Sequence, residues 1–183
     1  MPALDKDLRK AVLALPAARK DKLLLQLLTA QPVLQEQLRF ELLEGPEALA
    51  LRREALAAQV QTITQGFYYT ATDLLACLRQ LCPALGYHTK ITGDVYGEIQ
   101  LLLLLLQEVL SHQKEMLQVL TGATEALSLF LAKRAEEMLQ KLNKLHEDLH
   151  VEFSDDVNEV LPALHASAAG YAARKLGVPV RWK

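Results

Sequence analysis

The sequence contains few aromatic residues: four Phe, five Tyr and one Trp make up 5% of its 183 residues. Aromatic and β-branched residues favour strands, whereas the leucine and alanine that dominate this chain favour helices. The composition therefore predicts an all-α protein. At this length the chain suits one domain, or one domain with a loosely distinct N-terminal part.

No charge of one sign predominates, since 20 Lys and Arg stand against 22 Asp and Glu. Nucleic-acid and anionic-membrane surfaces are strongly basic, so neither partner is expected. The run of leucines at Leu101–Leu106 is far shorter than the roughly 20 apolar residues that cross a bilayer. Residues 1–7 mix charges and lack the apolar core of a signal peptide. A cytoplasmic protein without a membrane span is expected.

Cysteine is scarce as well, with Cys77 and Cys82 the two in the chain. On one helix, residues five apart have Cα atoms more than about 7 Å apart, which is too far for a disulfide. Their side chains also point to different sides, which disfavours a shared metal. We therefore expect both cysteines to be small core residues.

The six consecutive leucines of Leu101–Leu106 are the most apolar feature of the chain. At about 100° per residue they cover the whole circumference of a helix and leave no side for water. This pattern predicts a multi-helix bundle around a buried leucine-rich central helix, which runs from about Asp94 to Leu120. Leu103 and Leu104 are expected in the core.

Proline and glycine divide the first 66 residues into four short helical segments. The breaks fall at Pro16, Pro32, Gly45-Pro46 and Gly66. The connections are so short that successive helices must fold back on each other. Residues 1–66 are therefore predicted to form short helical hairpins, and residues 67–183 a bundle of long helices. Both parts are expected in one compact unit.

Three N-terminal segments carry a resemblance to other proteins: Leu15-Pro16, Asp21–Leu25 and Glu36–Glu44. They resemble a small family of all-helical bacterial proteins without assigned function. The resemblance lies within the N-terminal quarter of the chain, implies a helical fold, and supplies no activity. The paired helices also resemble HEAT-type hairpins, but no repeat period continues past residue 66, which argues against a solenoid.

Two helix ends are predicted in the middle of the chain. Thr70-x-x-Asp73 is typical of a capping box that opens a helix, and Pro83 is expected to end that helix after Cys82. Residues 84–93 lack a helical pattern and are predicted to form the longest ordered loop. Gly97, four residues after Gly93, permits close backbone approach at the start of the central helix.

Apolar residues at alternating spacings of four and three form a heptad seam and predict one long helix from Leu131 to Leu149. A last helix is expected from Ser154, with Pro162 kinking it or marking its true start. Small residues from Ala163 to Ala173 form a second face. Residues 124–152, which contain the heptad seam, and this small-residue face together carry more apolar surface than one monomer needs, which predicts a two-fold dimer. The alternative is a larger intramolecular bundle in which the N-terminal helices cover both faces.

His146-Glu147-Asp148-Leu149-His150 matches the zinc motif H-E-x-x-H. On a helix the two histidines could share a zinc, with Glu147 activating its water and Asp156 as a third ligand. Phe153 stands where the extended motif has glycine, however, and Asp148 adds an unusual charge. The alternative interpretation, which we prefer, places both histidines beside the leucine seam without a metal.

Other catalytic motifs lack a required residue set or have their residues at the wrong spacing. Di-iron bundles need two Glu-x-x-His motifs, and Glu147-x-x-His150 is the only one. Ser111 and His112 are sequence neighbours and point apart on a helix, so they do not pair for nucleophilic catalysis. Aromatic and basic residues remain as candidates for ligand or partner contact: Phe67, Tyr68, Tyr69, Tyr87, His88, Tyr96, Arg181 and Trp182.

The sequence therefore predicts a non-enzymatic, cytoplasmic helical interaction or adaptor protein that binds a protein partner or itself. No catalytic residue and no cofactor are expected. The alternative function is a small zinc-dependent hydrolase that uses the H-E-x-x-H motif at 146–150.

Overall fold

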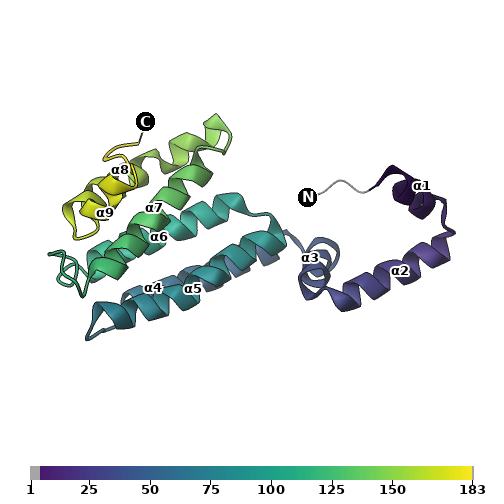
Figure 1. Cartoon of the computed structure of the whole chain (residues 1–183), viewed down its shortest axis with the longest axis horizontal. Coiled ribbons are helices and arrows are strands. Elements are labelled where there is room, and N and C mark those ends of the chain that lie inside the picture. The colour runs from purple at the N-terminus through teal and green to yellow at the C-terminus, as the bar shows by residue number, and fades with distance from the viewer. Residues whose placement is uncertain (1–4, 183) are drawn as a thin grey trace. The chain divides into compact units, whose positions relative to one another are not determined.

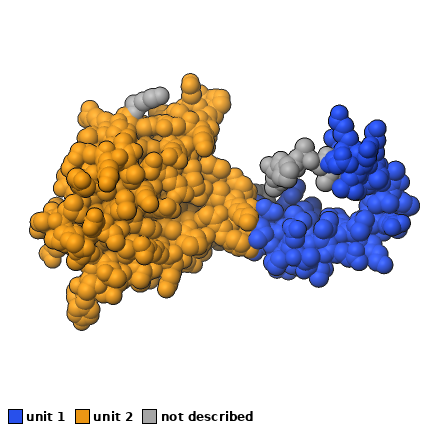
Figure 2. Space-filling view, in the orientation of Figure 1, with its two compact units in different colours: residues 1–45 blue, residues 46–183 orange. Residues whose placement is uncertain are grey.

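The structure is a computed structural model that describes residues 5–182, and the α-helices and one short 3-10 helix among them are the regular elements (Figure 1). No strand occurs in this range, so the all-α prediction is confirmed. The chain divides into two compact units, Met1–Gly45 and Pro46–Lys183 (Figure 2).

The first unit consists of α1 (Lys6–Ala14), α2 (Ala17–Ala30) and α3 (Pro32–Leu43). These helices end at the predicted prolines, because proline cannot donate a backbone hydrogen bond inside a helix. Asp5 caps α1, and its carboxylate accepts a hydrogen bond from the backbone N–H of Leu8 at 3.2 Å. None of the three helices contains a buried residue.

The second unit is built from three consecutive helical hairpins. They pair α4 (Pro46–Thr64) with α5 (Ala71–Thr92), α6 (Val95–His112) with α7 (Glu125–Leu142), and α8 (His150–Ala166) with α9 (Gly170–Lys175). Contacts join α4 to α6 and α6 to α8, and they likewise join α5 to α7 and α7 to α9. The hairpins therefore stack side by side in two layers (Figure 1), as in a short solenoid. The hairpins stack in this way although no sequence repeat continues past residue 66, an absence that argued against a solenoid.

The boundary between the units differs from the expected one. The division predicted from the sequence fell after residue 66, whereas the two compact units divide after Gly45. The reason is that α4 packs against α5 and α6, so that Val60 of α4 is fully buried in the core of the second unit.

Helix α6 is the central helix and contacts α4, α5, α7 and α8. Five of the six leucines at 101–106 are at most 3% exposed, which confirms the central-helix prediction and the burial of Leu103. Leu104 is the exception: it is only partly buried and packs against the edge of the core. One narrow side of the leucine run therefore does approach solvent.

Helix α5 continues past Pro83 to Thr92, so the predicted end at Cys82 and the predicted loop at 84–93 are wrong. Pro83 costs one backbone hydrogen bond. In return, the extension buries Leu85 and Ile91, which are at most 5% exposed. The capping box at Thr70 and Asp73 is present as predicted.

The long helices of the second unit are shorter than predicted. Helix α6 ends at His112 rather than near Leu120, and α7 ends at Leu142 rather than continuing to Leu149. The 3-10 helix η1 (Glu147–Leu149) and α8 follow, and α8 begins at His150 with Pro162 inside it. The heptad spacing thus continues across a chain reversal instead of along one helix.

Candidate functional site

A buried ionic junction joins α4, α5 and α6 at Asp94, the residue that caps α6. Its carboxylate accepts hydrogen bonds from Arg53 Nε at 2.5 Å, from Arg53 Nη2 at 2.6 Å and from the Gly97 N–H at 2.9 Å. His88 Nε2 lies 3.3 Å from the same carboxylate. The side chains of Asp94 and His88 are each 4% exposed, whereas that of Arg53 is 31% exposed, so the junction is buried except on its Arg53 side.

The electrostatics of the junction follow from this geometry. Burial alone would raise the pKa of Asp94, but the hydrogen bonds from Arg53, Gly97 and His88 outweigh burial and lower the pKa below its ordinary value of 3.8. Gly97 is required here, because a Cβ at this position would lie 2.1 Å from Asp94 Oδ2 and 2.5 Å from Arg53 Nε. The close approach expected at Gly97 is therefore an approach of its backbone to the ion pair between Arg53 and Asp94.

The H-E-x-x-H motif does not lie on one helix. His146 has an extended backbone and caps η1, its side chain is 77% exposed, and its Nδ1 accepts a hydrogen bond from the Asp148 N–H at 3.4 Å. His150 begins α8, and its Nε2 lies 3.0 Å from the carbonyl oxygen of Leu142, to which it donates. The two imidazoles therefore make separate hydrogen bonds. Within residues 5–182 no group of three His, Cys, Asp or Glu side chains is placed to hold a metal ion.

This arrangement predicts the metal behaviour of the protein. Protein purified without added metal should contain well under one zinc per chain, and a chelator should leave its thermal midpoint unchanged, because a bound metal would stabilise the fold. His150→Ala should cost about 1 kcal/mol through the lost hydrogen bond, while the matched His146→Ala should cost almost nothing. A tightly held zinc that both substitutions release would contradict this interpretation.

The predicted contact residues do not form one cluster. Phe67 and Tyr69 make an edge-to-face pair with centroids 4.9 Å apart and are 81% and 88% exposed. Tyr68 instead points inward and donates a hydrogen bond to the carbonyl oxygen of Ile63 at 2.7 Å. The loop expected around Tyr87 is helical, and Tyr87 itself is 41% exposed.

Two further candidates are core residues rather than surface contacts. His88 belongs to the Asp94 junction, and Trp182 is 9% exposed and donates from Nε1 to Asn143 Oδ1 at 3.1 Å. Arg181, its neighbour, is exposed. Tyr96 donates to Glu152 at 2.6 Å and thereby links α6 to α8.

The cysteines offer no reactive thiol pair. Cys77 and Cys82 are both free and partly buried rather than fully in the core. Burial raises the pKa of the Cys82 thiol to about 11, so this thiol is protonated at neutral pH and a poor nucleophile.

The seam that predicted a dimer surface is covered inside the second unit. Leu131, Met138 and Leu142 are fully buried, because α7 packs against α5, α6 and α9. The small-residue face is divided: Gly170 and Ala173 are buried, whereas Ala163 and Ala166 are exposed. Less apolar surface than expected therefore remains on residues 124–152: Leu129 is 41% and Val151 76% exposed, and Leu145 and Leu149 are partly buried.

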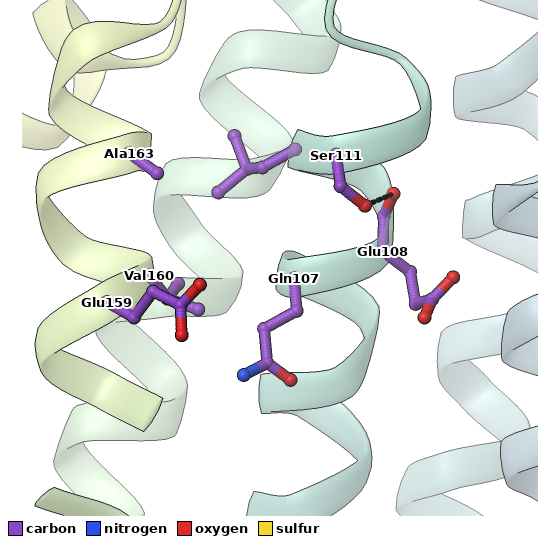
Figure 3. A pocket seen from close by; sticks show the side chains of 7 residues that line it. Gln107, Glu108, Ser111, Glu159, Val160 and Ala163 are labelled. Atoms are coloured by element: carbon purple, nitrogen blue, oxygen red, sulfur yellow. Dashed lines mark hydrogen bonds between the residues drawn. The ribbon is translucent and has the colours of Figure 1, made fainter. Parts of the chain in front are cut away.

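A groove that the sequence did not reveal lies between α6 and α8 (Figure 3). Two adjoining cavities of about 280 and 530 Å³ share Leu110, Ser111 and Ala163. The first is also lined by Gln107, Glu108, Glu159 and Val160, and the second by Lys114, Leu117, Gln118, Ala166 and Ser167. In Figure 3, α6 supplies one wall and α8 the other.

No protein-family model matches this chain, and no curated protein or solved structure is significantly similar to it. Within the described part of the chain, no helix has the length and apolar character needed to cross a membrane. A functional assignment therefore depends on the surfaces described above.

Proposed function

We propose that this protein is a non-enzymatic interaction protein that self-associates through the apolar faces of its N-terminal helices. The observation that carries the proposal is the exposure of leucine and valine in the first unit. Nine of these side chains are 40–78% exposed: Leu8, Val12, Leu13, Leu23, Leu24, Leu25, Leu27, Leu42 and Leu43.

The size of this surface fits a protein interface. Burying one such side chain is worth about 1.5–3 kcal/mol at about 25 cal/mol per Å², which corresponds to roughly 100 Å² each. Nine side chains about half exposed therefore present roughly 500 Å² of apolar surface over the three helices. Since interfaces are about 57% non-polar, an interface that covers all of them would take roughly 900 Å² from this unit. A standard interface takes about 800 Å² from each partner.

The charges of the same unit favour a second copy as the partner. Helix α2 carries Arg19, Lys20 and Lys22 against Asp21, whereas α3 carries Glu36 and Glu41 against Arg39. A two-fold axis would let the basic helix of one copy lie against the acidic helix of the other, and two-fold dimers are the commonest homo-oligomers. Such an interface would combine apolar burial with opposite charges.

Substitution of the α2 leucines tests the proposal. Light scattering at micromolar concentration should give the unmodified chain a mass near twice 20.4 kDa. The triple substitution Leu24→Gln, Leu25→Gln, Leu27→Gln should raise the dimer dissociation constant about 100-fold or more, since each half-buried leucine contributes about 1 kcal/mol.

Gln26→Ala is the matched control on the same helix and should leave the dimer intact. The second unit should melt unchanged in the triple variant, because α2 contributes no buried residue. A monomer mass for the unmodified chain at these concentrations would refute self-association.

A further inference from the structure

The loops that close the three hairpins of the second unit lie together at one end of it (Figure 1). We call them the end loops, and they are 65–70 after α4, 113–124 after α6 and 167–169 after α8. Gln113 Nε2 donates to the carbonyl oxygens of Thr64 at 2.7 Å and Gly66 at 3.0 Å, which joins the first loop to the second. The Ala168 N–H donates to the Leu117 carbonyl at 2.7 Å, which joins the second loop to the third. The end loops therefore form one connected surface.

This end of the unit carries almost no charge. Asp, Glu, Lys and Arg make up 23% of the chain, yet none occurs in residues 55–72, 116–124 and 160–173. Lys114 and Glu115 are the charged residues within the end loops, and they have opposite signs. The connection between α7 and α8, at the opposite end of these helices, contains Lys144, Glu147 and Asp148. The absence of charge is therefore particular to the end loops.

Large apolar side chains extend from the end loops into solvent. Phe67 is 81% and Tyr69 88% exposed, and they are the most exposed large hydrophobic residues of the described chain. In the second loop, Val119 is 65% and Leu120 40% exposed. Exposed apolar groups that gather on one surface mark a site of contact with a protein or a membrane.

The backbone of the end loops is hydrogen-bonded within the protein. Helix ends leave carbonyl groups without a helical partner, and here side chains supply donors for them. Tyr68 Oη donates to the Ile63 carbonyl at 2.7 Å, and Thr124 Oγ1 donates to the Val119 carbonyl at 3.1 Å. Gln113 does the same at the end of α4, as described above. Backbone groups that are paired in this way can enter surroundings that contain little water.

We propose that the end loops bind the surface of a phospholipid bilayer without net charge, and that Phe67, Tyr69 and Val119 insert among its headgroups. Aromatic side chains favour this region, and tyrosine does so because its ring is apolar and its hydroxyl stays in contact with water. Apolar groups bound at a bilayer surface reach about 5–10 Å into the boundary between headgroups and acyl chains.

The charges decide between lipid and a protein partner. A protein interface surrounds its apolar centre with a polar rim and is enriched in Arg. The end loops contain no Arg, and Lys114 is their one cation. The same lack of cations gives no attraction to anionic lipid, which needs clusters of Lys or Arg. Binding through the end loops does not depend on self-association through the first unit.

The test uses the full chain and vesicles of phosphatidylcholine, whose headgroup has no net charge. Co-sedimentation with the vesicles should show the unmodified chain bound at about millimolar lipid. Addition of phosphatidylserine to the vesicles should change the binding by less than about twofold at low salt, because the end loops have no cationic cluster.

Substitutions locate the contact. The double substitution Phe67→Ser, Tyr69→Ser should weaken vesicle binding at least about tenfold. Val119→Glu should weaken it by a similar factor, because a carboxylate must leave water to enter the bilayer surface. Leu51→Glu on α4 is the matched control, since Leu51 is 64% exposed against 65% for Val119, and it should leave binding unchanged.

A fluorescent reporter tests insertion directly. Phe67→Trp adds an exposed indole to the chain, whose own Trp182 is 9% exposed and supplies a constant background. The added fluorescence should shift to shorter wavelength on phosphatidylcholine vesicles and should be quenched by lipid with brominated acyl chains. Leu51→Trp should show neither effect.

Three results would each overturn the proposal. The first is absence of binding to phosphatidylcholine vesicles at about 10 mM lipid, which would assign the end loops to a protein partner. The second is binding that requires phosphatidylserine. The third is binding that the α2 triple variant loses and the Phe67→Ser, Tyr69→Ser variant keeps. The α2 triple variant should bind vesicles like the unmodified chain, so failure of self-association and failure of this proposal are distinguishable.

Discussion

Leu105→Ala should lower the free energy of unfolding of the second unit by about 2–5 kcal/mol, through lost transfer energy and the cavity left behind. Leu105 is 0% exposed in α6, which contacts four other helices. No neighbouring side chain at this position can move in without opening a gap elsewhere in the packed core. The substitution therefore removes contacts at the centre of the stacked hairpins.

Leu104→Ala is the matched control, one residue away in the same helix. Leu104 is expected in the core from the sequence but is only partly buried, so the same chemical change should cost less than half as much. Urea titration followed by circular dichroism measures both variants. Equal losses for the two leucines would show that the leucine run is buried on all sides, contrary to the structure.

The short helices of this chain could be predicted because their signals are local. Helices α1 and α2 end just before Pro16 and Pro32, since the missing N–H and fixed φ of proline act locally and no buried contact beyond these positions opposes them. The capping box at Thr70 and Asp73 is equally local. The leucine run predicted the central helix because a helix that is apolar on all sides is favourable only where other helices surround it.

The errors arose where distant contacts outweigh a local signal. Pro83 should have ended α5, but the burial of Leu85 and Ile91 in the core extends the helix beyond it. The heptad spacing from Leu131 to Leu149 continued in the sequence although the chain reverses after Leu142. Sequence periodicity alone does not distinguish an apolar stripe on one helix from the apolar residues of two segments that pack on a common core.

The candidate sites were predictable only in part. The small-residue face from Ala163 indicated close helix approach, and part of that face does line the groove. The ion pair between Arg53 and Asp94 joins residues 41 positions apart, so spacing alone could not indicate it. His88 was expected in a loop and instead completes this junction, because the loop itself is helical.

Asp94→Asn should destabilise the second unit by about 3 kcal/mol, the lower end of the cost of breaking a buried ion pair. Asparagine has nearly the same shape and can still cap α6, so the substitution removes chiefly the negative charge that Arg53 and His88 face. The lower end applies because the Arg53 side chain is 31% exposed and can recruit water. Asp73→Asn, in the exposed capping box of α5, is the matched control and should cost about 1 kcal/mol.

The same substitution should change how stability depends on pH. The pKa of Asp94 is lower in the folded protein than its ordinary value of 3.8, so the unfolded chain binds this proton first as the solution is acidified. The stability that Asp94 contributes is therefore complete above about pH 5 and is lost as pH falls through the folded pKa. Urea titrations between pH 7 and pH 2.5 should show the difference between the unmodified protein and Asp94→Asn shrinking below about pH 4. A difference that stays constant over this range would mean that the charge of Asp94 does not hold α4, α5 and α6 together.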